Sequence, residues 1–405
     1  MIPQLIWRNL SRNKRRSMIT IASVTFAIVI AILLRSLQKG VFNHLIDNIV
    51  SFQTGYLQIH GLGYQAEPIL ENSFELDSNA IKKWSEIEGI EQAAPRLESF
   101  ALATVHESTK GCLVNGIDIN KERQFTHIDT KITKGRYYVG NEKAILISEG
   151  LAERIKATVG DTLIILGQGF EGSMAAGKYP IIGILRFPMS SLNNNMIYLP
   201  LKYTQELFDA PNRLTALALR ISEPRNLSAI AHRLKANIGK QLEVVTWEEM
   251  MPDIVDHFKT DTIFFYIQIS ILYIIIAFGI FGTLLMMTYE RRQENGMLLA
   301  VGMKKRQLGM ILYGETVLLG MIGAIAGLLI SWPIVYYLQT HPIKFTGEFA
   351  RIYTQFGFEP IFPATLDLSI FLIQTLIIFS LTIVLGIYPF LSILRMNPLT
   401  AMKNR

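Results

Sequence analysis

The sequence has few of the residues from which catalytic and metal sites are usually built. It holds one cysteine and seven histidines in 405 residues. A single cysteine excludes a disulfide within the chain, and we expect Cys112 to be a small buried apolar side chain. No HExxH or GxSxG sequence occurs between residues 35 and 262, so no catalytic or metal site is predicted there. Isolated histidines are usually ordinary polar residues, and we interpret five of them so: His60, His106, His127, His232 and His257.

Long apolar runs are what the sequence does have. Half of its residues are hydrophobic and its mean hydropathy is +0.29. Four runs approach or exceed the roughly 17 residues that a helix needs to cross a bilayer. We therefore predict transmembrane helices at residues 18–34, 263–289, 308–338 and 368–394.

Basic residues next to these runs predict the orientation of the chain, because they stay on the cytoplasmic side. They concentrate in segments 1–17, 290–307 and 395–405, whereas the loop 339–367 has only Lys344 and Arg351, offset by acidic residues. Both termini are therefore expected on the cytoplasmic side of the membrane. Residues 35–262 are then outside. The first run is expected to be an uncleaved anchor, since Arg35 and Ser36 follow it and not a small-residue cleavage site.

Residues 35–262 have the pattern of a folded α+β domain inserted between the first two membrane helices. Expected strands are 55–59, 101–106, 162–166, 181–185, 196–199, 216–221 and 242–245, and expected helices are 79–87, 148–156, 201–208 and 226–238. The fold class is therefore an α-helical membrane protein with four transmembrane helices and a large extracytoplasmic α+β domain.

The two ends of this domain carry helix signals of their own. Apolar residues recur every fourth position at 37, 41, 45 and 49, which predicts that the first helix continues beyond the bilayer as a stalk, with Gly40 as a flexing point. Thr246 and Glu249 have the spacing of a capping box, which predicts a helix leading towards the second span. The alternative is that both segments are short surface helices.

The stretch EGSMAAGKYP, residues 171–180, is close to the phosphate-binding loop GxxxxGK[ST]. Gly172, Gly177 and Lys178 fit, but Tyr179 and Pro180 stand where a Ser or Thr and the start of a helix are required. An apolar run that reads as a strand follows. We therefore expect no nucleotide to bind here.

The cytoplasmic segment 290–307 is amphipathic. Charged residues flank an apolar patch of Met297, Leu298, Val301 and Met303, which is typical of a short helix pressed into the groove of a soluble partner. A basic loop lying against acidic lipid is the alternative.

This segment resembles the coupling helix of ABC-transporter permeases, in the class that includes the macrolide exporter, the lipoprotein-release permeases of the LolC and LolE type and the FtsX-like cell-division permease. Their pattern is approximately ExGxLxAxG, followed by basic residues and a membrane helix with an early glutamate. The residues of this sequence that match the pattern are Glu294, Gly296, Leu298, Ala300, Gly302, Lys304, Lys305 and Glu315. Weaker agreement with the same family comes from residues 7–17, 134–136, 159–161, 388–389 and 397–402.

The resemblance implies a permease subunit that is not an enzyme. It would pair with an identical or homologous permease and with two copies of a separate ATPase that binds ATP and Mg. The coupling residues would be the matching residues between Glu294 and Lys305, together with Met297. They would contact the ATPase, and its ATP-driven closure would be passed through them to the outside domain. The group most similar in size and arrangement releases lipoproteins to a periplasmic carrier. Alternatives are efflux of a drug, peptide or toxin through an adaptor, or a signalling permease that controls a wall hydrolase. Membrane lipids are expected partners, and nucleic acid is not.

Three further groups of residues give expectations about contacts. Glu315, the acid inside a span, is expected to reach Arg306 or Lys305, with a functional role as the alternative. The glycines Gly320, Gly323 and Gly327 are typical of close helix packing, within the subunit or across the permease pair. The expected loop at 171–180, with Gly172, Gly177, Lys178 and Tyr179, either contacts a periplasmic carrier or is a flexible hairpin tip.

Overall fold

A computed structural model describes residues 14–50, 54–75, 77–187, 189–348, 350 and 360–397. The N-terminal stretch to residue 13 and the tail from residue 398, where parts of the family resemblance fall, lie outside the described residues. The chain divides into two compact units. The first comprises residues 1–43, 258–344 and 361–405, and the second comprises residues 44–257 and 345–360.

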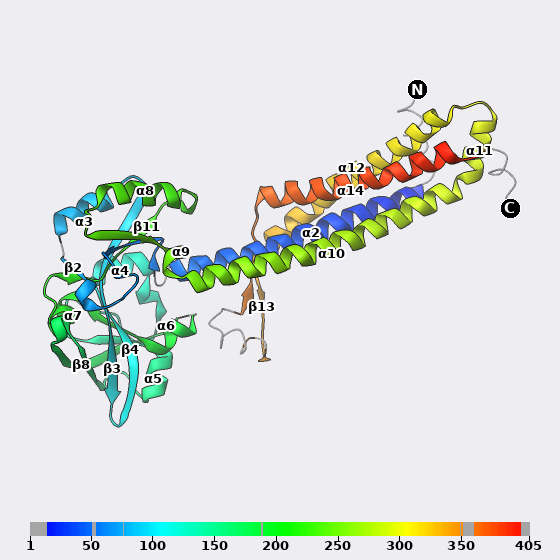
Figure 1. Cartoon of the computed structure of the whole chain (residues 1–405). Helices are drawn as coiled ribbons and strands as arrows, with labels where there is room; N and C mark the ends of the chain where they lie inside the picture. Colours follow the sequence, from blue (N-terminus) through cyan, green and yellow to red (C-terminus); the bar gives the residue numbers. More distant parts are fainter. Residues whose placement is uncertain are drawn as a thin grey trace. The chain divides into compact units, whose positions relative to one another are not determined.

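Four long helices form the first unit, and Figure 1 shows them running side by side. They are α2 (Lys14–Ile49), α10 (Pro252–Glu290), α12 (Lys305–Thr340) and α14 (Leu368–Arg395). All four are long and apolar enough to cross a membrane. The first is one helix through Ile49, as the apolar repeat predicted. Pro333 and Pro389 lie inside α12 and α14.

Small residues on α12 set the packing of the helices. A Cβ atom at Gly323 would lie 2.8 Å from Val24, and one at Gly327 would lie 2.8 Å from Ile28, so both glycines bring α12 against α2. A Cβ atom at Gly320 would meet Thr382 of α14 at 2.8 Å. The contacts of these three glycines are therefore within the subunit, which was one of the two alternatives.

The entry to α14 is fastened to α2. The backbone N–H of Thr365 donates to the carbonyl oxygen of Ser36 at 3.1 Å, and the Ser36 hydroxyl donates to the carbonyl oxygen of Thr365. Lys39 also forms an ion pair with Asp367. Gly40 is not the flexing point that its isolation in the sequence suggested: a Cβ atom there would lie 2.2 Å from the carbonyl oxygen of Pro363, so it is a close-packing position.

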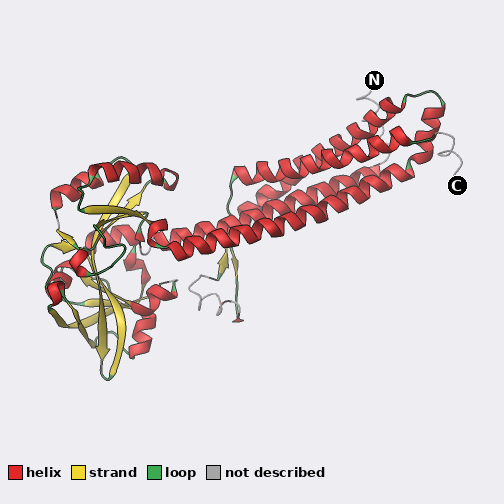
Figure 2. Ribbon diagram, in the orientation of Figure 1, coloured by secondary structure: helices red, strands yellow, loops and turns green. Residues whose placement is uncertain are grey.

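A large, mainly antiparallel sheet forms the core of the second unit, and Figure 2 shows its strands in yellow. Two pairs are parallel: β4 with β9 and β6 with β8. The strands are β1 (Leu57–Gly61), β3 (Ile90–Val105), β4 (Ser108–Ile117), β5 (Ile132–Gly135), β6 (Ile145–Ser148), β7 (Thr162–Gln168), β8 (Met174–Leu185), β9 (Met196–Pro200), β11 (Ala216–Ile221) and β12 (Leu242–Thr246).

Six of these strands pair in a closed circuit. The path runs from β3 through β4, β9, β6, β8 and β7 and returns to β3. Closure satisfies the backbone groups that an open edge would leave exposed. Alternate side chains of the circuit form a continuous apolar core, which includes Cys112 at 0% exposure. The expectation that this cysteine is buried is thus confirmed.

Short helices cover the sheet, and the four expected ones are present with small differences at their ends. They are α3 (Ser78–Ser85), α5 (Glu149–Ile155), α7 (Leu201–Leu207) and α8 (Leu227–Asn237). Helices α4 (Ile119–Thr126) and α6 (Ser190–Asn195) and the strands β4, β5 and β6 were not predicted. The fold class is confirmed: four long apolar helices, with an α+β domain between the first and the second.

The expected capping box is present, but the helix that it begins is short. Thr246 Oγ1 accepts from the N–H of Glu249 at 3.2 Å, and the Thr246 N–H donates to the Glu249 carboxylate at 2.7 Å. Helix α9 (Trp247–Met250) ends within four residues. Met251 leaves the helical conformation, and α10 begins anew at Pro252, whose missing N–H suits the first turn of a helix.

Candidate coupling surface

The segment predicted to couple the chain to a partner is a helix of its own. Helix α11 (Arg292–Ala300) has nine residues and lies between the end of α10 and the start of α12 (Figure 1). The preceding helix ends at Glu290, and α12 begins at Lys305, three residues before the predicted span. Three kinds of contact fix the position of α11.

A buried ion pair holds the junction of α10 and α11. Arg291 Nη1 lies 2.6 Å from Glu315 Oε2, and the side chains are 7% and 1% exposed. The expected partners of Glu315, Arg306 and Lys305, were therefore wrong. Arg306 is exposed on the first turn of α12, and Lys305 donates to the carbonyl oxygen of Leu394 at 3.3 Å. The carboxylate instead meets the arginine that precedes α11.

An apolar contact fixes the inward face of α11. Leu299 packs with Leu308 and Leu312 of α12, with Ile393 of α14 and with Met396, which follows α14. On the same helix Asn295 and Gly296 are also buried. Met303, which was predicted to belong to the apolar patch of this segment, packs against this cluster.

Gly302 ends α11 with a conformation that favours glycine. Its φ is +105°, and its N–H donates to the carbonyl oxygen of Leu299 at 3.1 Å. The N–H of Met303 reaches back to the carbonyl oxygen of Leu298 at 3.1 Å. These two bonds form a Schellman motif, in which a residue with positive φ closes the helix and satisfies its last carbonyl groups. The glycine in the family pattern therefore has a conformational reason.

The outward face of α11 is apolar and exposed. Met297 is 51% exposed, Leu298 42% and Val301 89%; we call these three residues the α11 patch. Glu294 and Ala300 are also exposed beside it, and Gly302, Lys304 and Lys305 are exposed just beyond the helix. Of the predicted coupling residues only Gly296 lies on the buried side. A fixed helix with an exposed apolar patch rimmed by charges is suited to docking on another protein.

The second candidate site, residues 171–180, was expected to be a loop, but most of it is a strand. The connection between β7 and β8 occupies only residues 169–173, where Glu171 and Gly172 have positive φ. Gly177, Lys178 and Tyr179 were placed in a loop, but they lie inside β8, paired with Ile165, Ile164 and Leu163. The strand begins seven residues earlier than expected, because MAAGKY alternates between the core and solvent without a run of large apolar residues.

This hairpin does not have the form of a phosphate-binding loop. Lys178 is exposed on a strand, the Tyr179 ring is 3% exposed in the core, and more strand follows where a phosphate loop needs a helix. Within the described residues, no group of three or more His, Cys, Asp or Glu side chains could hold a metal ion.

Two residues that fix α11, Arg291 and Leu299, are not indicated by the sequence pattern used above. Arg291 looks like one basic residue of a basic segment, and Leu299 is not in the predicted apolar patch. A signal for Leu299 existed: it lies four residues after Asn295, so both belong to one helical face. For Arg291 no local pattern indicated that its partner would be 24 residues away.

Two family models together match nearly the whole chain. The FtsX-like permease C-terminal region matches residues 266–398, which include α11. The MacB-like periplasmic core domain matches residues 17–237.

Individual relatives have low sequence identity to this chain, but their alignments cover most of it. An ABC transporter permease from Methanocaldococcus jannaschii is 22% identical over 80% of this chain and 81% of its own length. LolC of Neisseria meningitidis, a lipoprotein-releasing system transmembrane protein, is 21% identical over 80% of this chain and 79% of its own length. The macrolide export ATP-binding/permease protein MacB of Aggregatibacter actinomycetemcomitans is 22% identical over 79% of this chain, but the match spans 50% of that protein. Among solved structures, the periplasmic region of MacB from Actinobacillus actinomycetemcomitans covers 52% of this chain and 97% of its own, with 14% identity and a TM-score of 0.36.

Proposed function

We propose that this chain, which belongs to the FtsX- and MacB-like family of ABC-transporter permeases, receives ATP-driven movement at α11 and passes it to its periplasmic domain. Permease subunits of this family are not themselves catalytic. ATP and Mg would be bound by a separate ATPase, present in two copies, and a second permease, identical or homologous, would complete the transporter.

The observation that supports this proposal is the α11 patch on a fixed helix. Burying the exposed apolar area of Met297, Leu298 and Val301 in a partner groove would stabilise the complex, at roughly 25 cal/mol per Å². Because Leu299, Gly302 and the Arg291–Glu315 pair hold α11, a push on the patch would be transmitted to α10, α12 and α14. The alternative is that the patch lies in the lipid interface.

The orientation proposed for the chain puts α11 and both termini in the cytoplasm. Contacts of Val24 with Gly323 and of Ile28 with Gly327 make α2 parallel to α12, so Lys14 belongs to the end of the bundle at which α12 starts and α14 finishes. This end also carries the basic residues Lys304, Lys305 and Arg306, which favours the cytoplasmic side of a bacterial inner membrane.

For the substrate, lipoprotein release is the first function to test. The relative that is named for lipoprotein release matches over 79% of its length, and the macrolide exporter matches over 50% of its length. The periplasmic hairpin of β7 and β8, with Gly172 at its turn, is the corresponding candidate contact for a carrier. Macrolide-type efflux through an adaptor is the second candidate, since the MacB-like core domain covers residues 17–237.

The test is copurification from detergent-solubilised membranes of the native host, with the bound proteins identified by mass spectrometry and ATP hydrolysis measured. The variant is Leu298→Asp with Val301→Asp, because both side chains belong to the exposed α11 patch. Gly296 is unsuitable because it is buried. A matched control is Leu62→Asp with Val139→Asp, two exposed apolar residues of the other unit at 63% and 75% exposure.

We expect an ATPase to copurify with the parent and the control pair, and to be lost from the α11 pair. Acylated proteins or a carrier in the same sample would support lipoprotein release, whereas an adaptor would support efflux. Equal ATPase recovery from the α11 pair and the control pair would contradict the role of the α11 patch. If no nucleotide-binding protein copurifies with the parent, the proposed coupling to a separate ATPase is contradicted.

A further inference from the structure

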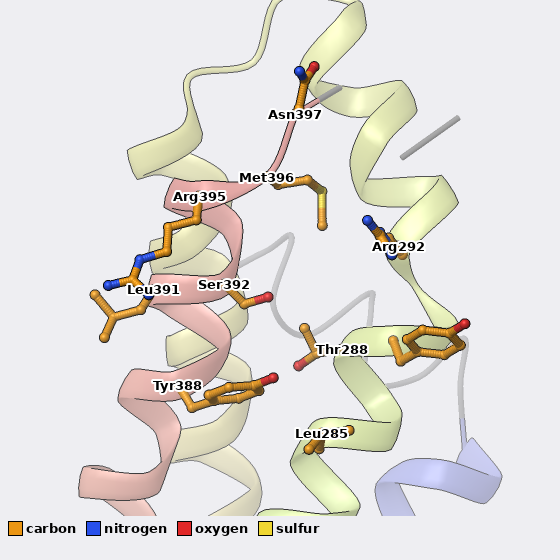
Figure 3. Close-up of a pocket in the computed structure, with 10 residues that line it drawn as sticks. Leu285, Thr288, Arg292, Tyr388, Leu391, Ser392, Arg395, Met396 and Asn397 are labelled. Atoms are coloured by element: carbon orange, nitrogen blue, oxygen red, sulfur yellow. The ribbon is translucent and has the colours of Figure 1, made fainter. Parts of the chain in front are cut away.

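A polar pocket lies beside α11, and none of the residues of the α11 patch lines it. It is a pocket of about 530 Å³ between the ends of α10 and α14 and the first residue of α11. Figure 3 shows Arg292 and Arg395 on opposite sides of it, with Thr288, Ser392 and Met396 between them, and the Arg395 side chain extends outward beside Leu391. Tyr388 lies below, on α14.

The charge of this pocket is one-sided. Two arginines line it, and no Asp or Glu is among the residues that line it. Within the described part of the chain neither Arg292 nor Arg395 forms a side-chain hydrogen bond or an ion pair. By contrast, Arg291, the neighbour of Arg292, is neutralised by Glu315 at 2.6 Å. A pocket with two such arginines attracts an anion.

The other lining groups favour a phosphate among anions. Guanidinium groups bind phosphate with two parallel N–H donors, and the hydroxyl groups of Ser392 and Tyr388 can donate to further phosphate oxygens, whereas the Thr288 hydroxyl already donates to the carbonyl oxygen of Leu284 at 2.8 Å. A carboxylate has two oxygens to accept these donors, and a phosphate ester has more. The polar wall therefore matches a phosphate better than a carboxylate.

The apolar wall indicates the source of the phosphate. Leu285 and Leu391 line the pocket and are 40% and 43% exposed. Apolar side chains continue away from it along both helices, among them Phe278 at 71% and Val384 at 60% exposure. A headgroup in the pocket would thus have its acyl chains beside exposed apolar surface, and basic pockets between membrane helices are known sites for anionic lipid headgroups.

We propose that Arg292, Arg395 and the hydroxyls of Ser392 and Tyr388 form a binding site for the phosphate of an anionic phospholipid. Its chemistry would also admit a soluble phosphate. The site does not depend on which protein docks on the α11 patch. Because Arg292 is the first residue of α11, an occupied pocket would add a contact at the start of that helix.

The experiment uses the full chain in nanodiscs of phosphatidylcholine, to which phosphatidylglycerol, cardiolipin or inorganic phosphate is added. Binding is measured by native mass spectrometry and by the shift in thermal unfolding midpoint. The variant is Arg292→Gln with Arg395→Gln. Its matched control is Lys304→Gln with Arg306→Gln, which removes two positive charges from exposed residues at the same end of the bundle.

We expect the pocket pair to weaken anionic-lipid binding about thirtyfold, since one basic residue near an anionic surface contributes about a factor of five. The control pair should lose much less, and Arg→Lys at both pocket positions should retain part of the affinity. Equal losses in the pocket and control pairs would overturn the site, because general surface charge would explain them. If inorganic phosphate gives a shift that the pocket pair abolishes, the phosphate site stands and its ligand is a soluble phosphate. The unfolding midpoint in phosphatidylcholine alone confirms that each variant is folded.

Discussion

Gly302 shows how one backbone conformation decides where a helix ends. Its φ of +105° is costly for any residue with a Cβ atom. We predict that Gly302→Ala costs about 1–2 kcal/mol and that hydrogen exchange at the amides of α11 becomes faster. The matched control is Gly279→Ala in α10, where no atom lies within 4 Å of the added Cβ and alanine favours the helix. Similar exchange of α11 in both variants would contradict the capping role.

The ion pair of Arg291 and Glu315 is a second case in which single residues matter. Removing one member of a buried pair leaves the other charge without that partner, which typically costs about 3–5 kcal/mol. We therefore expect Arg291→Gln to lower the thermal unfolding midpoint strongly in detergent. Arg306→Gln, at the exposed position where the sequence suggested the partner, should have little effect.

A double variant separates the charge from the packing. Arg291→Met with Glu315→Leu removes both charges, so it should be less destabilised than Arg291→Gln alone. If Arg291→Gln and Arg306→Gln lower the midpoint equally, the pair does not stabilise the protein.

At the scale of elements, the close approach of α2 and α12 depends on two glycines. We predict that Gly323→Leu or Gly327→Leu lowers the unfolding midpoint, because the side chain would meet Val24 or Ile28 where even a Cβ atom is 2.8 Å away. Overpacking of this kind costs about 1–3 kcal/mol or more. Gly279→Leu, which faces open space, is the control. If the control is equally destabilised, the glycines have no special packing role.

The contact between α2 and the start of α14 should depend on pH. The pKa of Asp367 is lowered to about 2, chiefly by the hydrogen bond from Lys39 and then by Ser369. A lowered pKa in the folded state stabilises the fold above the unfolded value of about 3.9, and this contribution is lost as the pH falls towards the folded value.

We therefore expect Asp367→Asn to be less stable than the parent at pH 7, by up to about 1 kcal/mol, since the pair is partly exposed. The difference should be constant from pH 5 to 8 and shrink between about pH 4 and 2. Thermal unfolding across this range measures it. A difference that shrinks between pH 6 and 8 would assign the effect to another group.

The sequence predicted elements well where the pattern was local. The four apolar helices, the Thr246 capping box and the strand at 216–221 follow from periodicity and spacing. Strand β4 was missed because its Ser108, Lys110 and Asn115 interrupt the apolar pattern, although its partner β3 compensates by pairing along its whole length. Long-range partners could not be predicted: the contact of Glu315 with Arg291 and the contact of Gly40 with Pro363 depend on how helices pack.

At the scale of the whole molecule, the order of segments was predictable because composition changes sharply along the chain. A basic start, an apolar run, a long mixed segment and three further runs leave one arrangement, with an inserted domain after the first span. The candidate coupling surface was predicted in part: six of its eight residues are exposed on or beside α11, a seventh, Gly302, is also exposed but acts as the helix cap, and Gly296 is buried. Whether a residue of a short helix is exposed depends on which neighbouring element covers it. The sequence alone does not show which element that is.

The burial of Cys112 makes this protein convenient for site-directed labelling. It is the only cysteine of the chain, it is 0% exposed, and burial raises the pKa of its thiol to about 12. At neutral pH the thiol is therefore covered and protonated, and a maleimide reagent would react slowly with it while the domain is folded. A cysteine introduced at Val301 or at Val139 would then be the single reactive group on its side of the membrane. Impermeant reagents applied to intact cells could report directly which face of the membrane each helix end occupies, with the natural cysteine left in place.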